Sequence, residues 1–256
     1  TSGMRSMAQA HVQRFIYSLS HHIVANSNAV RDKLIADGTG AEKVSVVYNG
    51  LDLRRLSTSA LRAESLSMLG LPSDSRRFVS IVANMRHEVK DYPMFLRSAR
   101  RVKDTVPEAA FLLAGEGELT ESLKALAREL GIEDSTFFLG RCENVAELLS
   151  ISEICVLSSK AEGFSNSILE YMAAARPVVV TDVGGAREVV SEGETGYLIA
   201  SGDDAAMADR LISLLRDPGK ARTIGEKGRR VVEEKFSCEA QLARTEALYE
   251  RLLSRR

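Results

Sequence analysis

Short apolar segments alternate with longer amphipathic ones through most of this chain, and that alternation limits the fold more than any other feature. The apolar segments are continuous rather than interleaved with polar residues, which is typical of strands buried on both faces of a parallel sheet. They lie at 78–85, 109–115, 136–140, 153–158 and 177–182. Helices are predicted between them, over 92–105, 119–130, 145–151 and 166–175. This order predicts an α/β fold with a doubly wound parallel sheet and right-handed crossovers.

Further elements are predicted on both sides of this core pattern. Near the amino terminus, strands are expected over 22–26 and 44–48, with a helix between them that Ser27 caps. A polar stretch from 54 to 75, holding one helix, separates this part from the rest. More helices are predicted over 1–20, 203–216, 221–234 and 240–253.

The composition narrows the classes of partner. The net charge is −1 and charged residues make up 27%, so nothing in the charge balance indicates nucleic acid or an anionic membrane. No apolar run approaches the ~20 residues that span a bilayer, and no signal peptide is visible. The cysteines are scattered, which suits a reducing, cytoplasmic compartment. No metal is expected, because no histidine lies at the spacing of a metal site from ligands of another type. The histidines are His11, His21, His22 and His87.

Polar residues gather at the carboxyl ends of the predicted strands, where ligands bind in a doubly wound sheet. The first strand end continues from Asn84 into a loop with two cations, Arg86 and Lys90, four residues apart. An arginine fork and a lysine point charge near a helix start can together hold a phosphate-rich ligand. For this segment alone, an exposed loop with solvated cations is the simpler interpretation.

The next two strand ends are less specific. Gly115 and Gly117 fit a turn where two backbones approach closely, because a dinucleotide fingerprint requires a third glycine where Thr120 stands. The loop at Arg141 and Cys142 has backbone groups that can meet a base edge, and a plain turn explains it equally well.

The fourth strand end carries two carboxylates, Glu162 and Glu170, around a turn and the start of a helix near Asn166. Free amides at that start favour an anionic group. Eight fully helical residues would span ~12 Å, which suits two ends of one elongated ligand. Glycosidase carboxyl pairs stand only ~5–9.5 Å apart. A turn acid and an exposed helix residue remain an alternative.

Residues 158–199 closely resemble the hallmark of family-four retaining glycosyltransferases, which have the GT-B fold. The hallmark is a Glu, seven residues, a second Glu, a helix of small residues, a buried strand and Gly-Gly. Other segments resemble the family in the same order, at 24–38, 44–52, 82–99 and 111–140. The resemblance covers nearly the whole chain, and the ordered combination is far more specific than any single piece.

The resemblance implies a role for each matching residue. Arg86 and Lys90 are similar to the pair that holds the donor diphosphate, and would stabilise it as it departs, without a divalent metal or other cofactor. Glu162 is similar to the acid that faces the transferred sugar, and Glu170 to the carboxylate that binds ribose. The Arg141–Cys142 loop resembles the one beside the base. The turn whose backbone contacts the sugar and phosphate is matched by Gly163, Phe164, Ser165 and Asn166.

Two residues depart from the family pattern. Arg176 replaces a glycine usual before the Pro-Val strand, so the preceding helix is expected to end without a left-handed cap residue. Tyr171 stands where alanine is common.

The domain organisation follows from the resemblance. We expect the end of an acceptor-side domain at 1–52 and an interdomain segment at 53–74. A donor-binding domain is expected at 75–236, and a final helix that packs back towards the acceptor side at 237–256. Most of the acceptor domain would be missing from this chain.

The expected function is transfer of a sugar from a nucleoside-diphosphate sugar to an acceptor hydroxyl with retention. UDP- or GDP-linked sugars are the first candidates, in the cytoplasm or at the cytoplasmic face of a membrane, with peripheral contact through the missing half. A donor-binding module inactive on its own, and an epimerase or hydrolase of the same fold, remain alternatives. A nicotinamide dehydrogenase is disfavoured by the missing third glycine.

Overall fold

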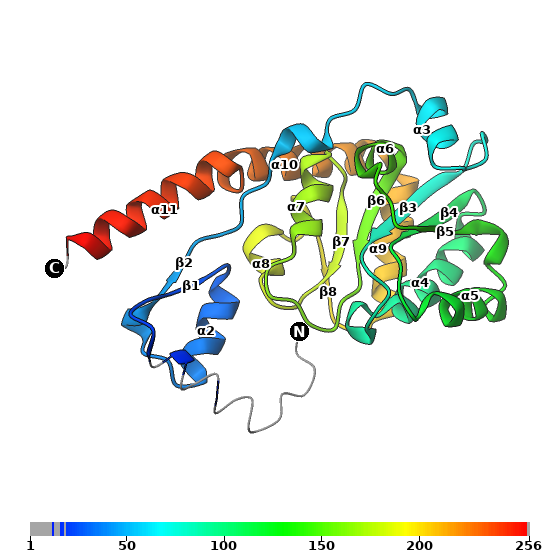
Figure 1. Cartoon of the computed structure of the whole chain (residues 1–256). Helices are drawn as coiled ribbons and strands as arrows, with labels where there is room; N and C mark the ends of the chain where they lie inside the picture. Colours follow the sequence, from blue (N-terminus) through cyan, green and yellow to red (C-terminus); the bar gives the residue numbers. More distant parts are fainter. Residues whose placement is uncertain (1–11, 13–15, 18, 255–256) are drawn as a thin grey trace.

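A six-stranded parallel sheet forms the centre of the chain, in a computed structural model that describes residues 12, 16–17 and 19–254 (Figure 1). The strand order is β5-β4-β3-β6-β7-β8, so the chain reverses direction across the sheet between β3 and β6. The strands are β3 (Arg77–Val82), β4 (Ala109–Ala114), β5 (Thr136–Gly140), β6 (Ser152–Leu157), β7 (Val178–Thr181) and β8 (Gly196–Ile199). The predicted doubly wound α/β fold is confirmed.

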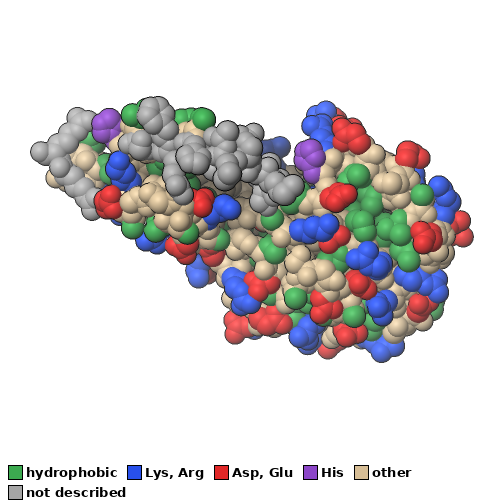
Figure 2. Space-filling view, turned by 90° about the horizontal axis from the view of Figure 1, so that it is seen from below, with side chains coloured by type: hydrophobic (Ala, Val, Ile, Leu, Met, Phe, Trp, Pro, Cys, Tyr) green, Lys and Arg blue, Asp and Glu red, His purple; other side chains and the backbone are tan. Residues whose placement is uncertain are grey.

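Helices cover both faces of the sheet and thereby bury the strand side chains on both sides. One core joins the sheet to α4 (Tyr92–Thr105), α5 (Thr120–Glu129) and α9 (Asp204–Arg216). The other joins it to α3 (Arg62–Met68), α6 (Val145–Ile151), α7 (Asn166–Ala173), α8 (Ala186–Val189) and α10 (Pro218–Lys235). At the surface, basic and acidic side chains are interspersed on the face shown in Figure 2, in keeping with the net charge of −1.

A small amino-terminal part has its own sheet. Two parallel strands, β1 (Ile23–Ala25) and β2 (Val44–Val46), pack against α2 (Asn28–Ala36), which Ser27 caps by accepting a hydrogen bond from Val30 N. The last helix, α11 (Cys238–Leu253), extends from the main sheet region towards this part (Figure 1). Gly50 N donates to Gln241 Oε1 on α11 at 2.9 Å. The helix expected over 1–20 lies largely outside the described residues, and the domain limits stay a prediction.

The expectation for the end of α7 is wrong. Ala175, one residue before Arg176, adopts the left-handed conformation with φ 55°. Ala175 N donates to Met172 O, and Arg176 N donates to Tyr171 O at 3.0 Å. These two bonds form a complete Schellman motif in which alanine takes the position usually given to glycine.

No helix within the described part of the chain is long and apolar enough to cross a membrane.

Candidate functional site

A pocket of about 370 Å³ opens at the carboxyl ends of β3, β4 and β5. Its lining includes Arg86, Arg141 and Cys142, which the sequence placed at two separate strand ends. The Gly115–Gly117 turn supports this lining: a Cβ on Gly115 would lie 1.8 Å from Ala83 O. A Cβ on Gly117 would lie 2.3 Å from the carbonyl carbon of Met85. The predicted close approach of two backbones is therefore confirmed.

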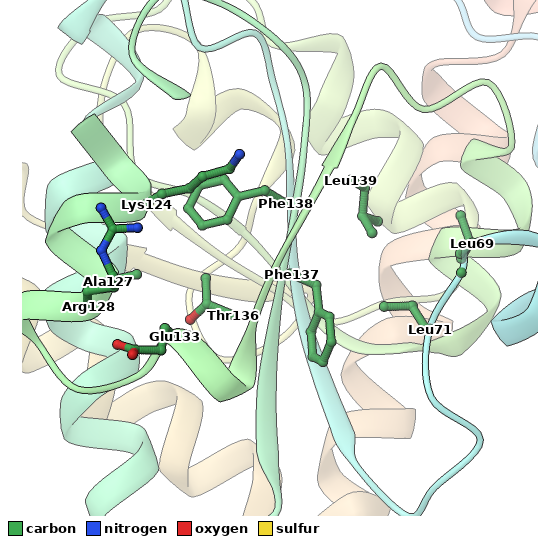
Figure 3. A pocket seen from close by; sticks show the side chains of 11 residues that line it. Leu69, Leu71, Lys124, Ala127, Arg128, Glu133, Thr136, Phe137, Phe138 and Leu139 are labelled. Carbon is green, nitrogen blue, oxygen red and sulfur yellow. The ribbon is translucent and has the colours of Figure 1, made fainter. Parts of the chain in front are cut away.

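A second pocket, of about 540 Å³, lies along the free edge of β5 (Figure 3). Figure 3 shows Phe137 with Leu71 on one side of the strand, and Phe138 with Lys124 and Arg128 on the other. This pocket is larger, but it contains none of the residues predicted at the strand ends. The volume alone therefore does not mark the functional site.

Lys90 and Glu162 meet beside the end of β6. Lys90 Nζ lies 2.6 Å from Glu162 Oε1, and the two side chains are 17% and 16% exposed. Arg86, in contrast, is exposed and has no ion-pair partner among the residues that the structure describes. Within the predicted diphosphate pair, one cation is thus free for a ligand and the other is already matched by a carboxylate.

Two serines that the sequence reasoning did not single out hold this ion pair in place. Ser158 Oγ donates to Lys90 O at 2.7 Å, and Ser159 Oγ donates to Glu162 Oε1 at 2.6 Å. Both serines are fully buried at the end of β6. The only signal in the sequence was a pair of hydroxyl residues directly after a buried strand, which is common in loops.

The turn after Glu162 is fixed from behind by a pair of glycines. Gly185 N donates to Gly163 O at 2.8 Å, and a Cβ on Gly184 would lie 2.2 Å from Glu162 O. The Phe164 ring is buried against Tyr48, with ring centroids 5.4 Å apart. Its side chain therefore packs in the core, and only its backbone can serve a ligand.

The remaining turn residues lie at the start of α7. Ser165 is the N-cap residue of α7 and has no side-chain capping bond, and Asn166 Oδ1 accepts from Asn49 Nδ2 at 2.9 Å. Glu170, one turn into the helix, is mostly buried, and this burial raises the pKa of its carboxyl, while the charge of Arg55 partly offsets the rise. A mostly buried carboxylate with no ion pair in the described part of the chain is suited to accept hydrogen bonds from a polar ligand.

Two tyrosines fix the end of β3, where it leads to Arg86. Tyr171 Oη accepts from Val82 N at 2.7 Å, and Tyr92 Oη donates to Ala83 O. Burial raises the pKa of both hydroxyls, so both stay protonated. Tyr171 therefore gives the departure from the family pattern a structural role.

Glu188, on α8, joins the site region to the amino-terminal part. Its carboxylate accepts from Asn28 N at 2.7 Å and Ala29 N at 2.9 Å, which are amides at the start of α2. It also accepts from Asn28 Nδ2 at 2.9 Å and Tyr48 Oη at 2.8 Å. Sequence reasoning missed this contact because Glu188 and its partners are 140 to 160 residues apart in the chain.

Metal ligands do not gather in the described part of the chain: it holds no group of three or more His, Cys, Asp or Glu side chains placed to bind one ion.

Known families and proteins are similar to this chain over most of its length. The family model "Glycosyl transferases group 1" matches residues 69–231, and "Glycosyltransferase Family 4" matches residues 2–55. N-acetyl-alpha-D-glucosaminyl L-malate synthase of Bacillus anthracis is 35% identical over 209 residues, covering 80% of this chain and 53% of that protein. Lipopolysaccharide core biosynthesis mannosyltransferase LpsB of Rhizobium meliloti is 28% identical over 216 residues, covering 82% of this chain and 61% of that protein. The chain thus spans about half the length of such relatives.

Solved structures share the fold. Anabaena Alr3699/HepE in complex with UDP superposes with a TM-score of 0.87 at 22% identity, covering 98% of this chain and 69% of that one. Sucrose-phosphate synthase from Thermosynechococcus elongatus superposes with a TM-score of 0.85 at 25% identity, covering 100% of this chain and 65% of that one.

Proposed function

The chain belongs to the glycosyl transferases group 1 family, with a GT-B fold, and from that premise we propose that it supplies the nucleotide-sugar site of a retaining glycosyltransferase. One observation carries the proposal: the pocket at the strand ends joins Arg86 to the Arg141–Cys142 loop, at the edge of the sheet where ligands bind. Because the chain spans about half of its curated relatives, the activity of the whole enzyme is part of the proposal.

The proposed chemistry rests on the two cations. The Arg86 guanidinium and the Lys90 ammonium stabilise the negative charge that develops on the departing nucleoside diphosphate. The acceptor hydroxyl attacks the anomeric carbon from the face that the diphosphate leaves, so the configuration is retained. Glu162 and the backbone of Gly163 face the transferred sugar, and Glu170 accepts hydrogen bonds from the ribose.

Uracil is the first candidate for the base. The structurally similar Alr3699/HepE has been solved with UDP and with UDP-glucose, and it shares the fold of this chain. The pocket beside Arg141 and Cys142 offers backbone groups to a base edge, which guanine or adenine can also meet.

We further propose that the diphosphate binds without a divalent metal. Arg86 supplies the charge that a metal supplies elsewhere, and carboxylates do not cluster beside it in the described structure. A cytoplasmic location belongs to the same proposal, and the three cysteines support it because none of them forms a disulfide. Peripheral contact with a membrane would involve residues outside this chain.

Calorimetric titration of the 256-residue chain with UDP, GDP and ADP tests the proposal. We expect saturable binding of one diphosphate, with an affinity that changes less than about twofold when EDTA is present. A folded sample that binds none of the three would contradict the proposed site. Incubation with the matching nucleotide sugar alone separates the alternatives, because an epimerase or hydrolase makes product without an acceptor. A donor-binding module makes none until the rest of the enzyme is supplied.

A further inference from the structure

The ion pair between Lys90 and Glu162 ties two residues of the proposed site to each other. Their atoms are 2.6 Å apart and both side chains are largely buried, so the contact is only weakly screened by solvent. A diphosphate bound at Lys90 would place a second anion on the same ammonium. The lysine has donors for both, but the two anions repel each other at such short range.

The two partners differ in how firmly they are held. Glu162 has a second anchor, because Ser159 Oγ donates to the same oxygen, Oε1, at 2.6 Å. Ser159 is itself fixed, since its carbonyl oxygen accepts from Thr181 Oγ1 at 2.6 Å. Its side chain is fully buried.

Lys90 has no such second anchor for its ammonium among the described residues, and its other anchor is at its backbone. Ser158 Oγ donates to Lys90 O at 2.7 Å, and Glu162 is the one hydrogen-bond partner of the Lys90 ammonium in the described part of the chain, at the end of a flexible four-carbon stem. The ammonium can therefore turn towards a phosphate, whereas the carboxylate stays in the turn.

We propose that Glu162 is a built-in competitor of the diphosphate for Lys90. Binding of the diphosphate draws the ammonium away, and Ser159 keeps the freed carboxylate beside the sugar position. The competition weakens the hold on the diphosphate, which favours its release once the sugar has been transferred. This inference rests on the proposed function, because it places the diphosphate at Arg86 and Lys90.

A double-mutant cycle tests the competition, with calorimetric titration of UDP, GDP and ADP into four proteins: wild type, Glu162→Gln, Lys90→Met and the double variant. Glutamine keeps the shape and can still accept from Ser159, so the fold should be kept. We expect Glu162→Gln to tighten binding of the preferred diphosphate about fivefold, which lies within the usual coupling between contacting residues. In the Lys90→Met background the same change should alter the affinity less than about twofold.

Two outcomes would overturn the inference while leaving the proposed function intact. The affinity of Glu162→Gln could equal or fall below that of the wild type. Alternatively, Glu162→Gln could tighten binding equally in both backgrounds, which would indicate general charge repulsion rather than competition for Lys90. If the folded wild type binds none of the three diphosphates, the proposed function fails and this inference fails with it.

Discussion

At the residue scale, Ala175 adopts a left-handed conformation in the Schellman motif that ends α7. A side chain in this conformation costs about 1–2 kcal/mol, because Cβ crowds the following carbonyl oxygen. Ala175→Gly removes that cost, and the greater freedom of glycine in the unfolded chain returns about 0.4–1 kcal/mol of it. We predict that the free energy of unfolding, measured by urea denaturation, rises by about 0.5–1 kcal/mol.

The neighbouring alanine is a matched control for this prediction. Ala174, the C-cap residue, has φ −77°, where alanine is unstrained. Ala174→Gly should therefore lower the free energy of unfolding by about 0.5–1 kcal/mol. A loss of stability in both variants would contradict the account of the α7 end.

Glu188 gives a pH-dependent prediction. Partial burial by itself would raise the pKa of this carboxyl, but hydrogen bonds from Ala29 N, Asn28 and Tyr48 outweigh it and hold the pKa below the ordinary value of 4.5. The pKa of Tyr48 is raised to about 12, by burial first and then by Glu188, so its hydroxyl remains a donor. A carboxyl with a lowered pKa in the fold stabilises the protein above its unfolded pKa, and this stabilisation is lost as the pH falls through the folded value.

We therefore predict that Glu188→Gln lowers the free energy of unfolding by about 1–3 kcal/mol at neutral pH, as for lost hydrogen bonds to a charged group. The difference from wild type should be constant above the unfolded pKa, about 4.5, and shrink below it. Urea denaturation across pH 3–7 measures this, with exposed Glu226→Gln as the control. A difference that does not change with pH would show that the charge of Glu188 is not what stabilises its contact with the start of α2.

Single residues also show what the sequence could predict of the site. The strand pattern predicts that Arg86, Arg141 and Cys142 lie at one edge of the sheet, where the ends of parallel strands meet, and only the family resemblance gives them a role in ligand binding. Ser159 and Glu188 could not be predicted in the same way. Their roles depend on side-chain contacts between elements, which periodicity and spacing do not encode.

At the scale of elements, the glycine pair after β7 positions the Glu162 turn. Gly184 has φ 57°, and a Cβ there would lie 2.2 Å from Glu162 O. Gly70 has a similar φ of 64°, but a Cβ there would meet nothing within 4 Å. Alanine at either position incurs the left-handed strain, and only alanine at Gly184 also displaces a packed backbone.

We predict that Gly184→Ala lowers the free energy of unfolding by about 1–3 kcal/mol more than Gly70→Ala does. Gly184→Ala should also weaken diphosphate binding, because the turn that carries Glu162 and Gly163 must move. Urea denaturation and calorimetric titration of both variants measure the two effects. Equal effects of the two substitutions would show that the glycine pair does not position the turn.

Long periodic elements could be predicted from the sequence almost residue by residue. The bounds predicted for α4 and α6 agree with the structure. For α4 they are defined locally, by amphipathic periodicity over 14 residues and by Asp91, whose side chain caps the first turn. The edge strand β8 and the short helix α8 were missed. Each has four residues, too few to establish a period, and β8 is defined by its pairing with β7.

At the scale of the whole molecule, the amino-terminal part packs against the proposed sugar position. The centroid of the Tyr48 ring lies 5.4 Å from the ring centroid of Phe164 and 5.4 Å from that of Phe236. The guanidinium carbon of Arg244, on α11, lies 5.4 Å from the Tyr48 ring centroid. Ser27 Oγ lies 3.5 Å from Gly163 O. Residues from the amino-terminal part and from the main sheet region thus meet at the Glu162 turn. A ligand that shifts the turn therefore also changes the contact between these two parts.

The proposed function depends above all on the binding of a nucleotide-sugar diphosphate by Arg86. Calorimetric titration of UDP, GDP and ADP into Arg86→Ala tests this most directly, with Arg230→Ala as the matched control, because Arg230 is also exposed and is not among the residues that line the strand-end pocket. We predict that Arg86→Ala weakens binding of the preferred diphosphate at least about tenfold, the effect of losing a charge-assisted contact, while Arg230→Ala binds like the wild type. Unchanged affinity in a folded Arg86→Ala sample would contradict the proposed site.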